Sequence, residues 1–267
     1  MNKLIGLISA TEKESRAILK TLRRIKGKSL ALPVYQGNIG KTNIIHIISG
    51  IGKTNAAHAA TLLIEKFSPS AVINFGIGGA YPSSGLKAGD IAIAEREIYG
   101  DEGLWLKDGF HKADEIGIPL LKKGRKKYFN EFTLDKSLVK KAMKVICPNS
   151  PTNPPIPPLL KGGKGGLKMV VLGDYRIKSG AFVTVSTVTG TDKRARELEK
   201  RFSAAGGAIC ENMEGAAVAH VCAMYGIPML EIRGISNIVE DRDRSKWDVK
   251  TAAENCQKTV LTFLLSR

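Results

Sequence analysis

The sequence predicts an α/β protein, a three-layer α/β/α sandwich with a central mixed sheet. Three observations favour this fold: short apolar runs of strand length, apolar stripes at helical spacing, and the alternation of the two along the chain. The length of 267 residues suits one domain with a sizeable core. We therefore expect a single domain over residues 1–267.

Candidate elements of both kinds follow one another in the first half of the chain. Apolar runs bounded by turn residues predict strands at residues 3–9, 34–38, 42–49, 71–75 and 90–94. Helices are predicted at residues 12–26 and 56–67, the second because apolar residues recur there with the spacing of a buried helical face. A turn is expected at Gly40, between the second and third strands.

The second half repeats this alternation after an interruption. Residues 148–168 contain six of the eleven prolines and four glycines, so we expect a surface insertion within the domain there. Strands are predicted beyond it at residues 181–188 and 228–235. Helices are predicted from residue 192, where Thr191 can cap the first turn, and over residues 213–224 and 249–264.

The composition narrows the function classes. No window approaches the roughly 18 apolar residues of a membrane helix, and the first residues lack the pattern of a signal peptide, so we expect a cytoplasmic protein without membrane contact. The four cysteines and four histidines are scattered, which predicts neither a metal site nor a cofactor.

The net charge of +16 raises the question of nucleic acid. The basic residues fall in separate groups, at residues 23–28 and 122–127, without the interleaved aromatics of a base-stacking platform. We interpret them as solvated surface. A nucleoside- or nucleic-acid-binding protein without catalysis stays the non-enzyme alternative.

Two phosphate-binding patterns are incomplete. The segment Ile51-Gly52-Lys53-Thr54 resembles the end of a P-loop, but Ile47 stands where the first glycine is needed. The segment at residues 76–79 lacks the third glycine of the dinucleotide fingerprint. A nucleoside triphosphatase and a dinucleotide enzyme are therefore disfavoured.

Three polar residues stand where predicted elements begin or end. Glu12 follows the first strand, Glu214 opens the helix after residue 212, and Asn237 closes the strand after residue 228. Taken alone, each of them could have a purely structural role, at the end of a helix or in a turn. Open α/β sheets, however, bind ligands where their strands end.

The chain resembles the nucleoside phosphorylase superfamily and, within it, the nucleosidases that act on methylthioadenosine and S-adenosylhomocysteine. The matching segments are residues 8–14, 49–57, 74–79, 89–91, 212–217 and 233–237. The resemblance implies that Glu12 activates a water and that Glu214 binds the ribose hydroxyls. It also implies that Met213 packs against the sugar and that Gly76, Ile77 and Gly78 line the ribose pocket. Ile51 and Asn212 are further expected substrate contacts.

The chain departs from the adenine-specific relatives at three positions. Asn237 replaces an aspartate, Asn212 replaces a glutamate, and Ile77 replaces a hydroxyl-bearing residue. An amide offers both an acceptor and a donor, which matches a protonated N7 and the O6 of a 6-oxopurine such as hypoxanthine. A flipped amide could also pair with adenine, so both bases stay open at this point.

Water is favoured over phosphate as the acceptor, because carboxylates stand where the phosphorylases carry phosphate-binding arginines. Residues 99–103 and 233–247 are similar to futalosine hydrolase, the member of the group in menaquinone biosynthesis. Its inosine-like substrate carries a carboxyphenyl group, which Arg242 or Arg244 could bind by its charge and Trp247 by its ring. The resemblance also implies a homodimer.

The expected function is therefore hydrolysis of the N-glycosidic bond of a 6-oxopurine nucleoside, futalosine first, without a cofactor. The enzymatic alternatives are a methylthioadenosine/S-adenosylhomocysteine nucleosidase and a purine nucleoside (inosine) phosphorylase.

Overall fold

The computed structural model describes residues 3–27, 30–146, 175–202 and 207–267. The insertion predicted at residues 148–168 lies outside the described residues. The strands are β1 (Leu4–Ser9), β2 (Leu22–Ile25), β3 (Val34–Ile39), β4 (Thr42–Ile48), β5 (Ala71–Ala80), β6 (Ile91–Tyr99), β7 (Gly103–Leu106), β8 (Gly109–Lys112), β9 (Leu121–Lys123), β10 (Lys126–Tyr128), β11 (Glu131–Thr133), β12 (Ile177–Thr184), β13 (Ala208–Asn212) and β14 (Met229–Ile238). The helices are α1 (Arg16–Leu19), α2 (Lys53–Phe67), α3 (Ala113–Ile116), α4 (Lys136–Ile146), α5 (Asp192–Arg201), α6 (Gly215–Tyr225) and α7 (Val249–Leu265), with short 3-10 turns at Pro82–Ser84 and Arg244–Lys246.

Ten of these strands form one mixed sheet, as predicted. Its order is β11-β6-β12-β13-β5-β1-β4-β3-β2, and β14 pairs with both β5 and β6. Strands β1, β4, β5 and β14 run parallel to their neighbours in this series, whereas β13 pairs antiparallel with β5 and β14 pairs antiparallel with β6.

The double pairing of β14 closes part of the sheet on itself. Strand β5 pairs with β14, β14 with β6, β6 with β12, β12 with β13, and β13 returns to β5. We call these five strands the closed ring. Sequence patterns do not reveal it, because it depends on pairings between segments far apart in the chain.

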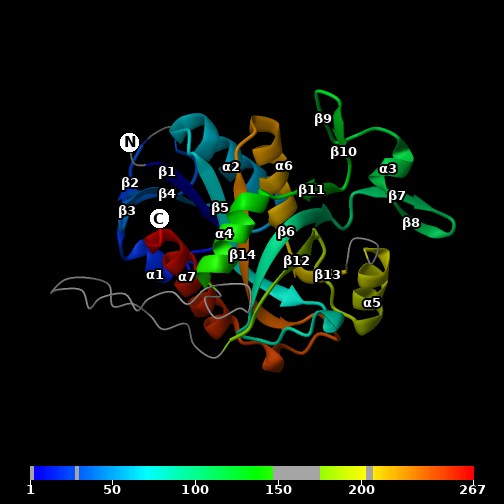
Figure 1. Ribbon diagram of the computed structural model, residues 1–267. Helices are drawn as coiled ribbons and strands as arrows, with labels where there is room; N and C mark the ends of the chain where they lie inside the picture. Colours follow the sequence, from blue (N-terminus) through cyan, green and yellow to red (C-terminus); the bar gives the residue numbers. More distant parts are fainter. Residues whose placement is uncertain (1–2, 28–29, 147–174, 203–206) are drawn as a thin grey trace.

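Helices cover the sheet in two layers (Figure 1). Helix α2 packs against α6, while α7 packs on β14 and β5 together with α1 and α4. Side chains alternate between the two layers along β14. Ile232 and Gly234 approach α7, where Cys256 donates to the Ile232 carbonyl and a Cβ on Gly234 would meet the Ala252 backbone at 2.0 Å.

The predicted helix at residues 12–26 is wrong except for four residues, Arg16–Leu19. The helix α1 ends at Leu19, and Leu22–Ile25 forms strand β2, antiparallel to β3. Leu22 lies opposite Gly37, where an added Cβ would come within 2.9 Å of its Cδ2, so the leucine packs into space that the glycine leaves. Pairing at the sheet edge here overrides local helix propensity.

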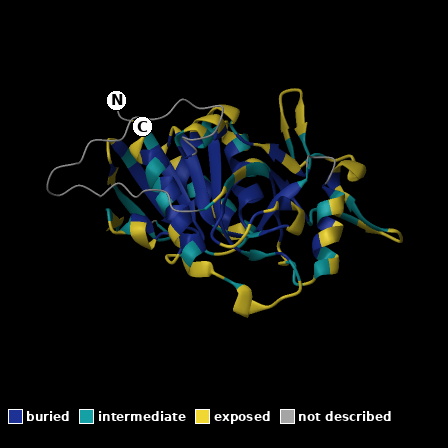
Figure 2. Ribbon diagram, turned by 60° about the horizontal axis from the view of Figure 1, so that its bottom comes forward, coloured by how far each residue is buried: buried dark blue, intermediate teal, exposed yellow. Residues whose placement is uncertain are grey.

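Two hairpins extend away from the sandwich. Figure 2 shows exposed and partly exposed residues on β7–β8 and β9–β10, in contrast to the buried central strands. Trp105 on β7 is 72% exposed and Leu106 is 51% exposed. In the described part of the chain, no helix combines the length and the apolar character needed to cross a membrane.

Candidate active site

Glu14 is the buried carboxylate that follows β1. The backbone N–H and the hydroxyl of Thr11 donate to Glu14 Oε2 at 2.8 and 2.9 Å, and the backbone N–H of Ile77 donates to Oε1 at 2.9 Å. Only 6% of the residue is exposed. The Thr11-to-Glu14 spacing is that of a capping box, in which a glutamate three residues on bonds back to the backbone N–H. The turn after β1 thereby directs this carboxylate toward β5.

Burial raises the pKa of Glu14 above its ordinary value of 4.5, and the nearby Glu214 adds to the rise. The guanidinium of Arg233, the Ile77 N–H and the Thr11 hydroxyl act in the opposite direction because they stabilise the anion. A carboxylate whose pKa is raised is a stronger base at neutral pH than an exposed one.

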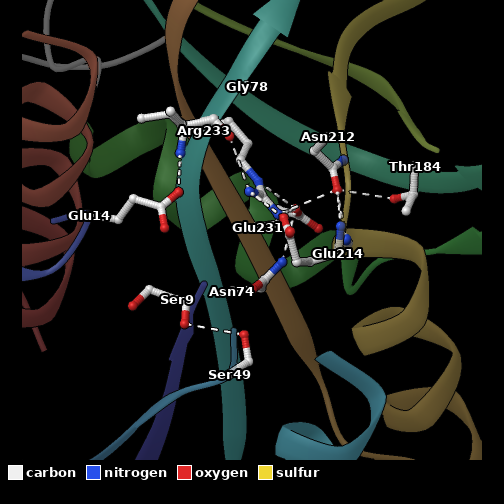
Figure 3. Close-up of polar contacts among 12 residues, drawn as sticks. Ser9, Glu14, Ser49, Asn74, Gly78, Thr184, Asn212, Glu214, Glu231 and Arg233 are labelled. Atoms are coloured by element: carbon white, nitrogen blue, oxygen red, sulfur yellow. Dashed lines mark hydrogen bonds and ion pairs between the residues drawn. The ribbon is translucent and has the colours of Figure 1, made fainter. Parts of the chain in front are cut away.

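Arg233, on β14, is the cation at the centre of the cluster (Figure 3). It is 2% exposed, and its Nη1 donates to Glu214 Oε2 and to the Ile77 carbonyl, both at 3.1 Å. Its Nε donates to Glu231 Oε1 at 2.9 Å. These buried carboxylates raise the pKa of Arg233 further, against the lowering effect of burial, so it stays charged.

Glu214 accepts a second bond from the incomplete P-loop segment. The backbone N–H of Gly52, at the start of α2, donates to Glu214 Oε1 at 3.0 Å. Gly52 has φ 95°, a conformation that glycine adopts readily. An N–H group that could face a phosphate at this helix N-terminus therefore holds a protein carboxylate instead.

Two glycines of β5 leave room for these groups. A Cβ on Gly76 would lie 2.4 Å from Glu14 Oε1 and 3.1 Å from Arg233 Nη1. A Cβ on Gly78 would lie 2.5 Å from the sulfur of Cys210. The predicted segment at residues 76–78 thus borders the cluster, and Ile77 contributes its backbone N–H and C=O rather than its side chain.

Asn212 lies in the cluster but has a different role from the one predicted. Its Oδ1 accepts from the backbone N–H groups of Glu214 and Gly215 at 2.9 and 2.7 Å, which caps the first turn of α6. Its Nδ2 donates to Glu97 Oε1 at 2.7 Å. Both ends of the Asn212 amide are thus bonded within the protein, and its contact with the substrate stays a prediction.

A buried polar network extends from Arg233 through the closed ring. Glu231 and Glu97 are fully buried, and Asn74 Nδ2 donates to Glu231 Oε1 at 3.0 Å. The Thr184 hydroxyl donates to Glu97 Oε2 at 2.7 Å. Sequence reasoning missed Arg233, Glu231, Glu97, Asn74, Thr184 and Glu14. The available signal was two charged residues, 231 and 233, on one face of a strand that otherwise reads as buried.

Glu12, the predicted base, lies apart from this cluster. Its side chain is exposed and lines a surface groove with Lys13, Arg16 and Lys20, and its nearest hydrogen-bond contact is Tyr35 Oη at 3.4 Å. The expectation that Glu12, Glu214 and Asn237 meet is therefore not supported for Glu12. The chain turns after β1 so that the second acidic residue of the segment, two positions on, points inward.

Asn237 stands at the end of β14 beside the glycine-rich end of β5. It is the register partner of Gly79, and a Cβ there would lie 3.4 Å from Asn237 Nδ2. Its Oδ1 accepts from the Ser236 hydroxyl at 2.7 Å, and its Nδ2 donates to the Ile238 carbonyl at 2.9 Å. These two bonds fix the orientation of the amide.

Asn237 lines a cavity with two of the predicted loop residues. Arg242 and Trp247 border it as well, and the Arg242 guanidinium lies 4.7 Å from the centre of the Trp247 ring. Arg244, the alternative cation, is not among the residues that line this cavity.

The remaining predicted contacts flank the carboxylates in sequence. Met213 is half-buried next to Glu214, and Ile51, 58% exposed, precedes Gly52. The described residues contain no group of three or more His, Cys, Asp or Glu placed to hold a metal ion. The arrangement brings together two buried carboxylates, a guanidinium and a glycine-rich strand end. Such a set can bind hydroxyl groups, take up a proton and stabilise positive charge.

Comparison of the sequence with known proteins identifies its family. Residues 4–265 match the phosphorylase superfamily. The chain is 30% identical to a futalosine hydrolase from Thermus thermophilus over 240 residues, which cover 90% of this chain and 89% of that protein. It is 26% identical to a 5'-methylthioadenosine/S-adenosylhomocysteine nucleosidase from an Exiguobacterium species, over 96% of this chain and 95% of the relative.

Solved structures share the fold. The nucleosidase of Neisseria meningitidis, in complex with methylthio-immucillin-A, superposes with a TM-score of 0.77 at 22% identity, over 99% of this chain and all of the other. The futalosine hydrolase of Helicobacter pylori superposes with a TM-score of 0.75 at 20% identity, over 99% and 98% of the two chains. The chain therefore belongs to the phosphorylase superfamily.

Proposed function

We propose that the protein is a nucleosidase that hydrolyses the N-glycosidic bond of a purine nucleoside. The observation that carries this proposal is the pair of buried carboxylates, Glu14 and Glu214, held on either side of Arg233 at the glycine-rich end of β5. The names of the relatives, futalosine hydrolase and nucleosidase, support the same class of reaction.

In this proposal Glu14, rather than Glu12, orients the attacking water and accepts its proton. Glu214 binds the ribose hydroxyls, and Met213 and Ile51 pack beside the sugar. Cleavage leaves positive charge on the sugar and negative charge on the departing base, so carboxylates beside the sugar stabilise the transition state. Arg233 bonds directly to Glu214 and to Glu231, and its charge stabilises the anion of Glu14.

Water as the acceptor is supported by the charges around Glu14. Arg233 is the cation that lowers the pKa of Glu14. Its N–H groups are already bonded to Glu214, Glu231 and the Ile77 carbonyl. The Gly52 N–H is bonded to Glu214. A phosphate would meet two carboxylates here and no uncommitted donor among these groups, which disfavours phosphorolysis.

The proposed base is a 6-oxopurine bound by Asn237. Flipping this amide would set Oδ1 against the Ile238 carbonyl and leave the Ser236 hydroxyl facing an NH₂ group. The bonds inside the protein use one acceptor site and one N–H, so one of each is free to meet protonated N7 and O6. This free acceptor and free donor are the pair that hypoxanthine requires, and we propose hypoxanthine as the base on that ground.

The proposed substrate is futalosine, which places the reaction in menaquinone biosynthesis. Arg242 and Trp247 border the same cavity as Asn237, so a carboxylate and an aromatic ring at the 5' end could be bound there together. Arg242 is the stronger candidate than Arg244, since only Arg242 lines this cavity. The exposed Trp105 and Leu106 on β7 suit a homodimer contact in this proposal.

A substrate panel tests the proposal. The protein is incubated with futalosine, inosine and methylthioadenosine, with and without phosphate, and free base is separated by chromatography. Hypoxanthine from futalosine without phosphate is the expected result. Adenine from methylthioadenosine as the main product would support the nucleosidase alternative and overturn the assignment of Asn237. A requirement for phosphate would overturn hydrolysis, and no turnover of any nucleoside would favour the binding-protein alternative.

A further inference from the structure

The closed ring contains a pair of carboxyl groups that no step of the proposed reaction uses. Glu97 on β6 and Glu231 on β14 are both fully buried. A Cβ on Gly215 would lie 2.0 Å from Glu97 Oε1 and 2.5 Å from Glu231 Oε2, so both oxygens face the same point at the start of α6. Glycine at residue 215 leaves the space in which the two carboxyl groups approach each other.

The neighbours of the pair assign its charges. Glu231 Oε1 accepts from Arg233 Nε at 2.9 Å, whereas both hydrogen bonds to Glu97 come from neutral groups, the Thr184 hydroxyl and the Asn212 amide. The buried Glu231 Oε2 has no hydrogen-bond donor beside it in the described structure apart from the facing Glu97 carboxyl. Two ionised carboxylates in such contact would repel strongly, and only one of them touches the cation.

We infer that Glu97 is a positioning residue that stays protonated and donates its proton to Glu231 Oε2. The bond holds Glu231 against Arg233, and Arg233 in turn holds Glu214. Glu97 also accepts from Asn212, whose oxygen caps the first turn of α6 where Glu214 lies. A single uncharged carboxyl group thus connects both supports of the proposed ribose-binding carboxylate while touching no substrate.

The other titratable groups around Glu97 are consistent with this state. Burial, followed by the charge of Glu231, raises the pKa of Glu97 well above its ordinary value. Burial likewise raises the pKa of the Cys210 thiol on β13 and of the Tyr99 phenol on β6, so both stay neutral. The charged groups that face the pair are therefore Arg233, on β14 like Glu231, and Glu214, at the start of α6.

Stability as a function of pH tests the proton on Glu97 without reference to activity. Glu97 ionises near pH 4.5 in the unfolded chain, whereas its pKa in the folded protein is raised well above that value. As the pH rises between these two pKa values, the free energy of unfolding of the wild type therefore falls relative to that of a variant with a permanently neutral side chain. We compare wild type with Glu97→Gln by urea unfolding at pH 5 and pH 8. The unfolding constant of the variant, relative to that of wild type, should fall about tenfold or more between the two values. A ratio that does not change with pH would show Glu97 ionised in the folded protein and overturn the inference.

Two variants then test positioning, and this part alone depends on the proposed function. A glutamine NH₂ group can still donate to Glu231 Oε2, although it cannot accept from Asn212 as Glu97 Oε1 does. Glu97→Gln should therefore retain kcat within about threefold, whereas Glu97→Leu, which loses the donor as well, should lose about tenfold or more in kcat with little change in KM. Full activity of Glu97→Leu would overturn the positioning role, and so would an equal loss in both variants. In infrared spectra, Glu97→Gln should remove the carbonyl band of a buried protonated carboxyl group. Persistence of that band would overturn the assignment even if the wild type turned over no nucleoside.

Discussion

The two ends of the proposed site are built in opposite ways. Around Arg233, the carboxylates of residues 14, 214 and 231 are at most 6% exposed, and each accepts at least two hydrogen bonds. Arg242 lies on an exposed loop, and its guanidinium is placed mainly by its contact with the Trp247 ring. The end proposed to cleave the bond is thus fixed by a network that tolerates little change, while the end proposed to select the substrate lies on a loop that can vary.

Removing the cation of the buried end should have the largest effect. Arg233→Ala leaves several buried carboxylates without their counter-charge, and we expect a loss of about 3–5 kcal/mol in the free energy of unfolding. Urea denaturation followed by circular dichroism measures it. Arg242→Ala, at the exposed end, should change the same quantity by no more than about 0.5 kcal/mol. Equal effects of the two substitutions would erase the contrast between the two ends.

The next largest effect is expected at Glu14. Glu14→Gln keeps the shape of the side chain but removes the base, so kcat should fall about a hundredfold or more. Glu12→Gln is the matched control, two residues away on the exposed groove, and should leave kcat unchanged. A large loss in the Glu12 variant with a normal Glu14 variant would restore the interpretation based on sequence alone.

The same carboxylate predicts the acid side of the pH profile. The base must be ionised to act, and burial raises the pKa of Glu14 above 4.5. Activity should therefore fall as the pH drops through this raised pKa, with a midpoint above 4.5. A kcat profile that stays level down to pH 4.5 would contradict Glu14 as the base.

Base selection at Asn237 should respond less strongly. In Asn237→Asp, a carboxylate faces O6 of a 6-oxopurine, acceptor against acceptor, so the ratio of kcat/KM for futalosine to that for methylthioadenosine should fall about tenfold, the equivalent of one hydrogen bond. Competition assays with both nucleosides measure this ratio. An unchanged ratio would remove Asn237 from base recognition.

The smallest effect is expected on the exposed loop. Arg242→Ala should raise the KM for futalosine about fivefold, in keeping with roughly 1 kcal/mol from a solvent-exposed ion pair, and should leave the KM for inosine alone because inosine lacks the carboxylate. Arg244→Ala is the matched control outside the cavity. If the two variants exchanged their effects, the cavity would not be the binding place of the 5' group.

Sequence reasoning reached the fold and named some of the residues that lie in the candidate site. Strands β1, β3, β4 and helices α2 and α7 were predicted close to their observed bounds, because their apolar patterns depend on local burial. Glu214 and the glycine segment were also found, since both stand at element ends.

What it missed depends on contacts between distant segments. Glu14 can be preferred to Glu12 only when the turn after β1 is known to face β5, where the Ile77 N–H donates to Glu14. The spacing from Thr11 to Glu14, typical of a capping box, was the available sequence signal. Arg233 was passed over because a buried cation makes sense only once Glu231 and Glu214 are seen around it. The insertion at residues 148–168 stays a prediction.

The closed ring has a consequence for how the protein is made. Its last strand, β14, follows β5 and β6 in the chain by more than 100 residues, yet it fills the place between them and carries Arg233. A nascent chain that has not yet delivered β14 from the ribosome lacks the central cation and leaves strand edges on β5 and β6 unpaired, which are sites for aggregation or chaperone binding. The proposed site can therefore assemble only after residue 238 has left the ribosome.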